Sequence, residues 1–509
     1  MVEASPVVLD GQSLSADDVV RVARYHSPVA LHADGLARLE ASWRASQRLV
    51  VRRQVYGRTT GVGANRDQIV STEGWAEHGL RLLRSHAGGL GGMLPEEQVR
   101  AMMVVRLNQL LAGGAGVRPA VADALLAALN SSCYPGVHEY GAIGTGDLTA
   151  LAETGLTLLG ERYWLGSTQT PDPIELDSGD ALALISSNAL TIGMAGLAWK
   201  DAHQLLKATS VVAALSFLAV DGAVEAYDER VHQGRPHPGQ VAVAAEMRRL
   251  IGDPPRPAAR IQDPFGYRCF PQIHGPAVDA ATDLARVLDV EFNAAAENPL
   301  IVADHFGPSD DAAYHHGAFH SAYLGQALDR LRLSMLHTGH LSTARLATLV
   351  EPNFTGLRPF LAEGVRGSSG VMILEYSANS ALAEVRTLAE PASIGNAVVS
   401  RGQEENSSFA FQSASQALRS LSAFRLVLAC EVVAAVRALR LRGDHAGHAV
   451  VAGGFRGRGV EAEPGHGGPA AEPGRGGGFG AARRLRGVLT SRWPGRVGGC
   501  QFEARAKAG

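Results

Sequence analysis

Residues 416–439 read QALRSLSAFRLVLACEVVAAVRAL, and this stretch decides the fold class. Leu421, Phe424, Leu428 and Val432 recur at intervals of three and four residues, which places them on one face of an α-helix. The other faces of this helix also carry many apolar residues, as is typical of a helix buried on several sides. We therefore expect a long helix in the interior of a helical bundle.

A second stretch has the same periodicity. Leu324, Leu328, Leu331 and Met335 repeat at intervals of four, three and four residues, and a shorter helix is expected to begin at Pro119. Strand signals are few along the whole chain. The sequence therefore predicts an all-α protein with a long central helix bundle.

We expect three parts along the chain, of which only the last is set apart by its composition. We assign residues 1–200 to an N-terminal domain, residues 201–442 to the long-helix bundle and residues 443–509 to an atypical tail. The tail is rich in glycine, arginine and proline and has no helical periodicity, which predicts disorder. A shifted reading frame in GC-rich DNA would produce the same mixture.

The composition also limits the classes of function. The 509 residues have a net charge of −3 and no long basic run before the tail, which argues against nucleic acid or an anionic membrane as partner. The longest apolar stretch, residues 208–220, is too short to span a bilayer, and the acidic N-terminus lacks a signal-peptide pattern. The four cysteines form no CxxC pair, as expected for reduced thiols. We therefore expect a cytoplasmic protein.

Loops rich in glycine and polar residues separate the predicted helices. In a bundle, loops held by rigid helices are where we expect the chemistry. They lie at residues 56–66, 84–92, 131–147, 261–272 and 351–370.

Two of these loops contain glycines around a hydroxyl group. Tyr56 precedes a glycine-rich segment that ends at Gly63, an arrangement that can bring a phenol close to a ligand. Gly144, Thr145 and Gly146 form either a tight turn or a backbone arranged for unusual reactivity. Taken alone, each motif is better explained as a structural turn, and neither matches a dinucleotide fingerprint or a P-loop.

Charged side chains mark two further candidate sites. Arg268 could hold a carboxylate through two parallel hydrogen bonds, and a structural salt bridge explains the same arginine equally well. Glu404 and Glu405 could serve in acid–base chemistry or bind an amine, or they could complement the N-terminus of a helix.

Three histidines stand in segments where they could bind a ligand or a metal. His86 stands in a loop without a recognisable partner. His316 and His320 are four residues apart, a spacing that binds metals when it lies on a helix, but no third ligand is evident. We therefore predict no metal site.

The order of these motifs resembles the histidine and phenylalanine ammonia-lyase family and its related aminomutases. The resemblance covers about residues 20–440. It is carried by Tyr56-Gly57, Ser85-His86-Ala87-Gly88, Arg106-Leu107-Asn108, Gly141 to Leu148, Gln262-Asp263-Pro264, Arg268-Cys269, Glu297-Asn298-Pro299, Pro391-Ala392-Ser393 and Gln403-Glu404.

The resemblance implies a fold, an assembly and an activity. It implies an all-α homotetramer in which a bundle of long helices brings three subunits to each active site. It further implies elimination of ammonia from histidine or an aromatic amino acid, or a shift of the amine to the β-carbon. Tyr56 matches the family's catalytic base and Arg268 its carboxylate-binding arginine. The residues that match pocket-lining positions are His86, Asn108, Gln262 and Glu404. Ser186 is also predicted to bind substrate, although the family's Asn-Gly-Thr stretch reads Ser186-Ser187-Asn188 here.

The departures from the family concentrate at its electrophile. The family makes a methylidene-imidazolone from an Ala-Ser-Gly tripeptide, which reads Gly144-Thr145-Gly146 here. Dehydration of Thr145 would leave an extra methyl group on the carbon that the amine attacks. Phe265 replaces a family tyrosine, with Tyr267 nearby.

Three functional alternatives follow from these departures. The first is a lyase or aminomutase whose ring forms from residues 144–146. The second is a relative without the cofactor that catalyses another elimination or addition in secondary metabolism. The third is a non-catalytic scaffold that binds a ligand or a partner.

Overall fold

The computed structural model describes residues 5–71, 74–176, 179–254, 256–303, 310–444 and 450. These residues form a mostly helical protein, so the predicted all-α class is confirmed. Most of the tail predicted to be atypical lies outside the described residues. The helices are α1 (Ala16–Tyr25), α2 (Ala33–Arg52), α3 (Trp75–His86), α4 (Glu96–Leu111), α5 (Pro119–Asn130), α6 (Leu148–Leu158), α7 (Asp180–Ile185), α8 (Ala189–Ala219), α9 (Glu229–Gln233), α10 (Pro238–Ile251), α11 (Phe265–Arg268), α12 (Phe270–Glu291), α13 (Ala322–Leu349), α14 (Pro352–Thr355), α15 (Ile373–Thr387) and α16 (Ala410–Leu441).

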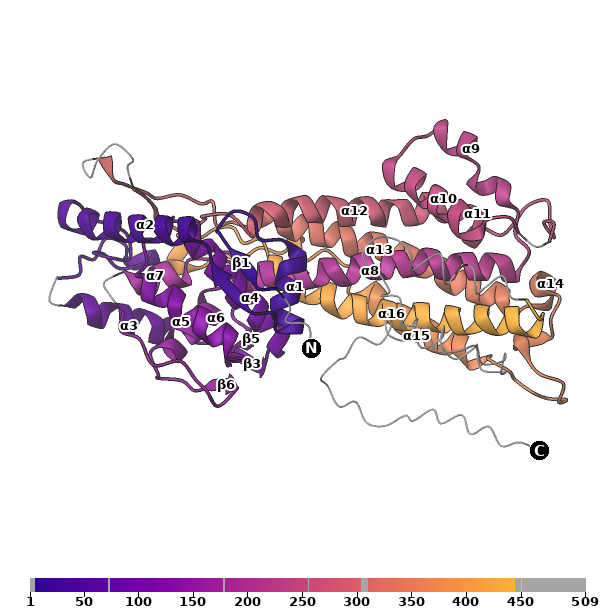
Figure 1. Cartoon of the computed structure of the whole chain (residues 1–509), viewed down its shortest axis with the longest axis horizontal. Coiled ribbons are helices and arrows are strands. Elements are labelled where there is room, and N and C mark those ends of the chain that lie inside the picture. Colours follow the sequence, from indigo (N-terminus) through magenta and orange to yellow (C-terminus); the bar gives the residue numbers. More distant parts are fainter. Residues whose placement is uncertain are drawn as a thin grey trace, which may run out of the picture.

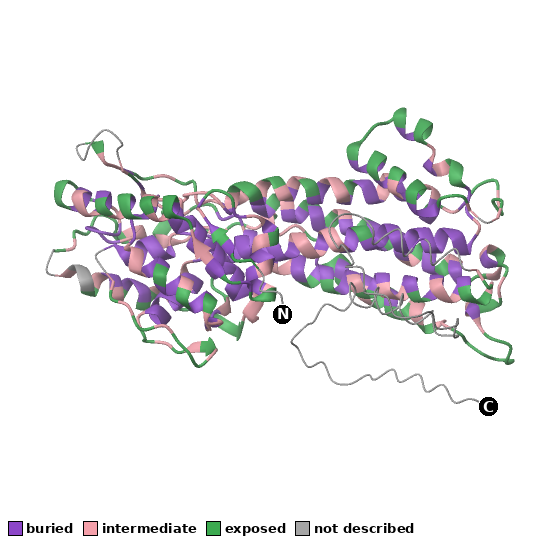
Figure 2. Ribbon diagram, in the orientation of Figure 1, coloured by how far each residue is buried: buried purple, intermediate pink, exposed green. Residues whose placement is uncertain are grey.

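The long helices form one elongated bundle (Figure 1). α16 packs against α8, α13 and α15, while α12 packs against α13 and also against α10. The apolar stripes predicted at residues 324–335 and 416–439 lie on α13 and α16, and the helix predicted from Pro119 is α5, so all three predictions are confirmed. Buried residues follow the inner faces of these helices and exposed residues the outer ones (Figure 2).

α8 connects the N-terminal part of the molecule with the bundle (Figure 1). The stretch Asp180–Ala219, which contains α7 and α8, is long and apolar enough to cross a membrane by composition. However, 94% of its apolar window is buried inside the protein, as in the core helix of a bundle. Residue 200, the predicted domain boundary, lies inside α8, so the division into domains stays a prediction.

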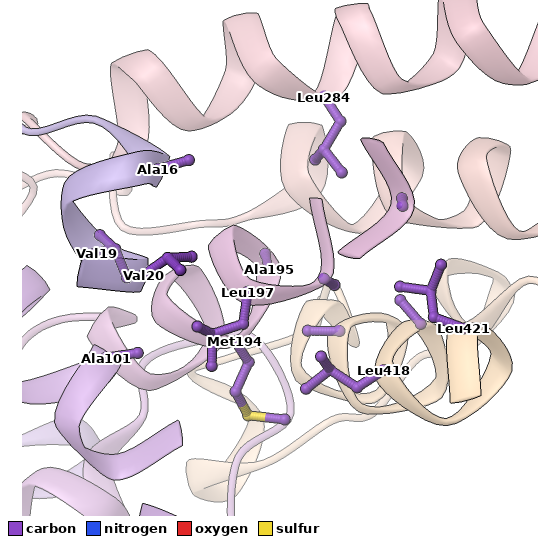
Figure 3. Packing of buried hydrophobic residues seen from close by; sticks show 14 of the residues in the cluster. Ala16, Val19, Val20, Ala101, Met194, Ala195, Leu197, Leu284, Leu418 and Leu421 are labelled. Carbon is purple, nitrogen blue, oxygen red and sulfur yellow. The ribbon is translucent and has the colours of Figure 1, made fainter. Parts of the chain in front are cut away.

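Helices from both parts meet in a common core (Figure 3). Gly193 of α8 allows α4 to approach closely, because a Cβ atom there would lie 2.7 Å from the carbonyl carbon of Ala101. Buried side chains of α1, α4, α8, α12 and α16 fill this junction, among them Ala16, Val19, Val20, Ala101, Met194, Leu197, Leu284, Leu418 and Leu421.

Short strands add two-stranded sheets to the helical frame. β1 (Val7–Leu9) pairs in parallel with β2 (Val29–Leu31). The antiparallel pairs are β3 (Leu90–Met93) with β5 (His138–Tyr140), β4 (Cys133–Pro135) with β6 (Trp164–Gly166), and β7 (Leu300–Val302) with β8 (Ala312–Tyr314).

The hairpin β7–β8 returns to the N-terminal part although it follows α12 in sequence. Both of its strands contact α2, and Arg48 of α2 forms an ion pair with Asp311 at 2.6 Å. β7 and β8, which fall in the range that we assigned to the bundle, therefore pack on the N-terminal half. Asn298, His315 and Phe319, which flank this hairpin, line the same cavity as the loop that follows α2.

Candidate functional site

A cavity of about 750 Å³ opens where several loops of the N-terminal half meet. Its wall comes from the loop after α2, the end of α3, the start of α6, α7 with the residues after it, and the loops near residues 315 and 403. Two of the five polar loops predicted to carry chemistry, 261–272 and 351–370, do not contribute to it. The predicted site residues that line the cavity are Tyr56, His86, Thr145, Gly146, Ser186 and Glu404.

Tyr56 lies at the first turn of the loop after α2. Its hydroxyl oxygen accepts a hydrogen bond from the backbone amide of Gly63 at 2.7 Å. Gly63 has a φ of +54°, so the chain can curl back and point this amide at the phenol. The His315 ring stands edge-on to the Tyr56 ring, with 6.4 Å between ring centroids.

The environment of Tyr56 holds the pKa of its phenol above the ordinary value. Burial is the largest cause, and the negative charge of Glu404 acts in the same direction. The Gly63 amide and the positive charge of Arg66 lower the pKa and offset part of the rise. The phenol is therefore protonated at neutral pH in the single chain.

His86 is the last residue of α3, at the edge of the cavity. Its Nδ1 donates a hydrogen bond to the Leu82 carbonyl at 2.9 Å and lies 3.0 Å from the Ser85 hydroxyl. Because Nδ1 carries the proton in this arrangement, Nε2 is left as a hydrogen-bond acceptor. Nε2 of His86 and the carboxylate of Glu404 are thus two hydrogen-bond acceptors in the cavity wall for the N–H groups of a ligand.

The tripeptide from 144 to 146 is held by hydrogen bonds to its backbone. Both glycines have positive φ, +86° at Gly144 and +121° at Gly146, which favours glycine at both positions. The Ser408 hydroxyl donates to the Gly144 carbonyl at 3.0 Å, and the Gly146 amide donates to Asn188 Oδ1 at 3.1 Å. Thr145 between them lines the cavity.

Asp147 anchors this tripeptide to the start of α8. Its two carboxylate oxygens accept hydrogen bonds from the Thr191 amide and hydroxyl, each at 2.8 Å. Burial raises the pKa of Asp147 to about 6, against the hydrogen bonds from Thr191 and Leu190, which lower it. The carboxyl group is completely buried, so its part is to hold the loop.

α4 supports the cavity from behind. Arg106 donates to the Leu184 carbonyl of α7 at 3.0 Å and pairs with Glu297 at 2.8 Å, and both of these side chains are buried. Gln109 accepts a hydrogen bond from the Ser187 hydroxyl at 2.7 Å. The helix thereby fixes the wall formed by α7 and the residues after it.

Asn108 belongs to this supporting layer and not to the cavity. It is completely buried, and its amide bonds the Gly11 amide, the Phe292 carbonyl and the Asn293 side chain. Every donor and acceptor of the side chain is thereby used within the chain. Asn108 is therefore not among the residues that line the cavity, and its predicted contact with substrate stays a prediction.

Arg268 and Gln262 lie far from the cavity of their own chain. Arg268 ends α11, at the opposite end of the molecule from α7 (Figure 1). Its Nε donates to the Asp263 carbonyl at 2.8 Å, and its guanidinium lies 4.2 Å from the centroid of the Phe265 ring. Gln262 is exposed.

Tyr267 does not take the place of the family's tyrosine at position 265, where this chain has Phe265. It is completely buried, its hydroxyl bonds Thr348 at 2.6 Å, and burial raises its pKa. α11 and the first turn of α12 also occupy part of residues 261–272, where we expected only a loop.

The structure adds cavity residues that the sequence did not single out. Arg66, Asn298, Phe319 and Ser400 line the wall, as does His315, whose Nε2 accepts a hydrogen bond from the Tyr56 amide at 3.4 Å. Asn298 stands in a motif that carries the family resemblance, and Arg66 lies in the polar loop at residues 56–66. For His315 and Ser400 the sequence carries no signal, because their segments reach the cavity only through the folding of distant loops.

His316 and His320 do not have the helical spacing considered for a metal. They stand in the turn before α13, and His320 Nε2 bonds Asn406 Oδ1 at 3.0 Å. Across the described ranges, no three His, Cys, Asp or Glu side chains are grouped to hold a metal ion. Cys133, Cys269 and Cys430 are free thiols.

A family model described as aromatic amino acid lyase matches residues 14–455 of the chain. A histidine ammonia-lyase of Treponema denticola is 34% identical over 458 residues, covering 87% of this chain and 89% of that protein.

Solved structures have the same fold. A tyrosine aminomutase from Streptomyces globisporus superposes with a TM-score of 0.80 at 28% identity, covering 86% of this chain and 89% of that chain. The ergothionase of Treponema denticola, crystallised with desmethyl-ergothioneine sulfonic acid, superposes with a TM-score of 0.80 at 26% identity, covering 87% and 91%.

Proposed function

This chain belongs to the aromatic amino acid lyase family, and we propose that it eliminates ammonia from histidine in the cytoplasm. An amine shift on histidine or an aromatic amino acid is the related reaction on the same site. The observation that carries the proposal is that Tyr56 and Thr145, the positions of base and electrophile in the family, line one cavity.

The backbone of residues 144–146 fits the family's ring-shaped cofactor. Glycine at 144 and 146 permits the positive φ angles, Ser408 donates to the oxygen of the Gly144 carbonyl, and Asn188 accepts from the Gly146 nitrogen that ring closure would join to the carbonyl carbon. When present, an electrophile at Thr145 makes the substrate's amine a better leaving group and its β-proton more acidic. The remaining tasks belong to side chains of the chain itself.

Tyr56 is the base in this proposal. Its phenolate would take the β-proton of the bound amino acid, and the Gly63 amide would stabilise the phenolate through the hydrogen bond to its oxygen. Substrate binding brings an ammonium group into the cavity, and a positive charge favours the ionised phenol. Tyr56→Phe should lower kcat by about a hundred- to ten-thousandfold.

His86 and Glu404 support an imidazole-containing substrate. An imidazole ring presents an N–H group that the free Nε2 of His86 or the Glu404 carboxylate can accept. A phenyl ring offers no such donor and would leave these polar groups without partners. This comparison favours histidine over phenylalanine.

We propose that Arg268 and Gln262 act in the cavity of another subunit. A homotetramer with bundles side by side would bring α11 of one chain to the loops of the next. Large apolar side chains exposed on the bundle support such an assembly. They are Tyr323 at 80% exposure, Ile373 at 63%, Tyr376 at 67% and Leu426 at 60%.

An absorbance assay tests the proposal. Purified protein mixed with histidine should produce the ultraviolet absorbance of an α,β-unsaturated acid, with less or none from phenylalanine and tyrosine. Chromatography for a β-amino acid product would detect the amine shift. A wild-type protein that converts none of the three amino acids would overturn the proposal.

A cofactor-independent elimination is the second candidate, and Thr145 favours it. The methyl group of threonine would remain on the attacked carbon of a ring, where it hinders the approach of an amine. This candidate predicts turnover by a protein whose residues 144–146 keep their full peptide mass. The first candidate predicts turnover only with the ring present.

A further inference from the structure

We infer that Ser408 polarises the Gly144 carbonyl and thereby promotes closure of the ring within residues 144–146. The inference rests on the ring of the proposed function and assigns a task to a residue outside the tripeptide. Ser408 lies immediately before α16. Its side chain thus connects the long bundle with the cavity loops.

The hydroxyl of Ser408 is aimed by its neighbours. The side chain is 5% exposed, and its oxygen accepts a hydrogen bond from the Ala410 amide at 3.3 Å while donating to the Gly144 carbonyl at 3.0 Å. A second bond, from the Phe409 amide to the Ile143 carbonyl at 2.9 Å, holds the same two segments together. The donor is therefore fixed in a site almost free of water, where it polarises a carbonyl most strongly.

Glycine at 144 makes room for this contact. A Cβ atom built on Gly144 would lie 2.0 Å from the Ser408 oxygen and 2.9 Å from the Phe409 amide nitrogen. A side chain in this conformation would displace the hydroxyl from the carbonyl. Gly144 therefore leaves the space that the Ser408 hydroxyl occupies in this structure.

The attacking atom is held on the other side of Thr145. The Gly146 nitrogen donates its proton to Asn188 Oδ1 at 3.1 Å, and Asn188 also donates to the Phe319 carbonyl. This acceptor increases electron density on the Gly146 nitrogen. The electrophilic carbonyl and the nucleophilic amide thus each have a partner of the required polarity.

Ring closure proceeds in steps that balance. The Gly146 nitrogen bonds to the Gly144 carbonyl carbon, and its proton passes to the carbonyl oxygen, whose growing negative charge Ser408 stabilises. That oxygen leaves as water with the Thr145 amide proton, which creates a C=N bond. The α-proton and hydroxyl of Thr145 leave as a second water and create a C=C bond. No oxidant or other reactant is needed.

Timed mass spectrometry of the full chain tests the inference. Newly synthesised protein is quenched at intervals, and the peptide that contains residues 144–146 is weighed. Loss of the first water reports ring closure, and loss of the second reports dehydration of Thr145. In Ser408→Ala the first loss should be about a hundredfold slower or more, as when a single oxyanion donor is removed.

Matched variants separate polarisation from folding. Ser407→Ala removes the neighbouring buried hydroxyl, which bonds the Ala397 carbonyl instead, and should close the ring at the wild-type rate. Ser408→Thr keeps the donor and should restore closure. If Ser408→Ala does not fold, Ser408→Cys keeps the size of the side chain with a weaker donor and should close slowly.

Two outcomes would overturn the inference. If a folded Ser408→Ala protein closes the ring at the wild-type rate, Ser408 does not promote ring closure, and the proposed lyase function is unaffected. If the wild-type chain never loses water, no ring forms and the inference is wrong. In that case the absorbance assay decides separately whether elimination occurs without the ring.

Discussion

At the scale of single residues, two opposite charges act on the phenol of Tyr56. Glu404 raises the pKa of Tyr56 and Arg66 lowers it, in addition to the larger effect of burial. Because the base must be ionised to accept a proton, the pKa of this phenol determines the pH at which activity rises. The charges of Glu404 and Arg66 therefore help to set the pH at which kcat/KM rises.

We predict opposite shifts of this limb in two variants. Glu404→Gln removes a charge that raises the pKa of Tyr56, so the limb of kcat/KM should move to lower pH. Arg66→Gln removes a charge that lowers this pKa, so the limb should move to higher pH. Both profiles are measured with histidine over the same pH range.

Low salt should enlarge both shifts, because Arg66 is exposed and salt screens its charge. Shifts in the same direction, or none, would mean that the limb belongs to a group other than Tyr56. Glu404→Gln should also raise KM, because it removes a proposed acceptor for the substrate.

The sequence predicted some residues of the site and not others for physical reasons. Tyr56 and Thr145 became candidates because their glycine-rich motifs stand in the same order as those of the family, although each motif alone predicts only a turn. The place of Asn108 behind the cavity wall could not be predicted, because almost every residue of α4 is buried and no polar face indicates the direction of a side chain. His315 and Ser400 were missed because they reach the cavity through loops distant in sequence.

At the scale of elements, a buried ion pair connects two bundle helices. Arg345 of α13 and Glu431 of α16 are both completely buried and pair at 2.6 Å. The hydroxyls of Ser216 on α8 and Ser342 on α13 also donate to the Glu431 carboxylate. One carboxylate thus joins three helices of the bundle.

We predict that Glu431→Leu lowers the free energy of unfolding by about 3–5 kcal/mol, because it leaves the Arg345 charge buried and unpaired. Adding Arg345→Leu should recover part of this loss. Urea unfolding followed by circular dichroism measures both variants.

The exposed pair between Arg419 and Glu384, at 3.0 Å on α16 and α15, provides the control. Arg419→Ala should change the free energy of unfolding by less than about 1 kcal/mol. Equal losses in Glu431→Leu and Arg419→Ala would contradict the stabilising role assigned to the buried pair.

The bundle was predictable from sequence, and the hairpin β7–β8 was not. Helical periodicity extends over many turns of α13 and α16, so the pattern stands out from chance. Each strand of the hairpin has three residues, too few for an alternating pattern. The hairpin packs on α2 through contacts such as the ion pair between Arg48 and Asp311, and no local sequence pattern predicts such a contact.

At the scale of the whole molecule, the two ends of the bundle carry different parts of the proposed site. Tyr56 and Thr145 lie at the cavity, and Arg268 lies on α11 at the opposite end (Figure 1). A rigid, packed bundle cannot fold back to join them within one chain. If Arg268 binds the substrate's carboxylate, a second chain must supply it.

We predict that two inactive variants become active when combined in one oligomer. Tyr56→Phe lacks the base and Arg268→Gln lacks the carboxylate clamp, and each alone should lose most of its turnover. In an equal random mixture, half of the chains have an intact Tyr56 and the other half have an intact Arg268. If each site takes these two residues from different chains, about a quarter of the sites should contain both intact residues. Co-expression with two tags, double purification and the absorbance assay measure the recovery.

The control combines two variants from the same cavity. Tyr56 and His86 of one chain line one pocket, so mixing Tyr56→Phe with His86→Ala leaves each site with one defect and should restore nothing. Light scattering of the mixtures checks that four chains are present. Because the contacts of Arg268 within the described part of the chain are with a backbone carbonyl and a ring face, Arg268→Gln should leave the stability of the chain nearly unchanged. Failure of recovery in assembled tetramers would mean that Arg268 serves no neighbouring cavity, and Arg66 would then be the arginine left to bind the carboxylate.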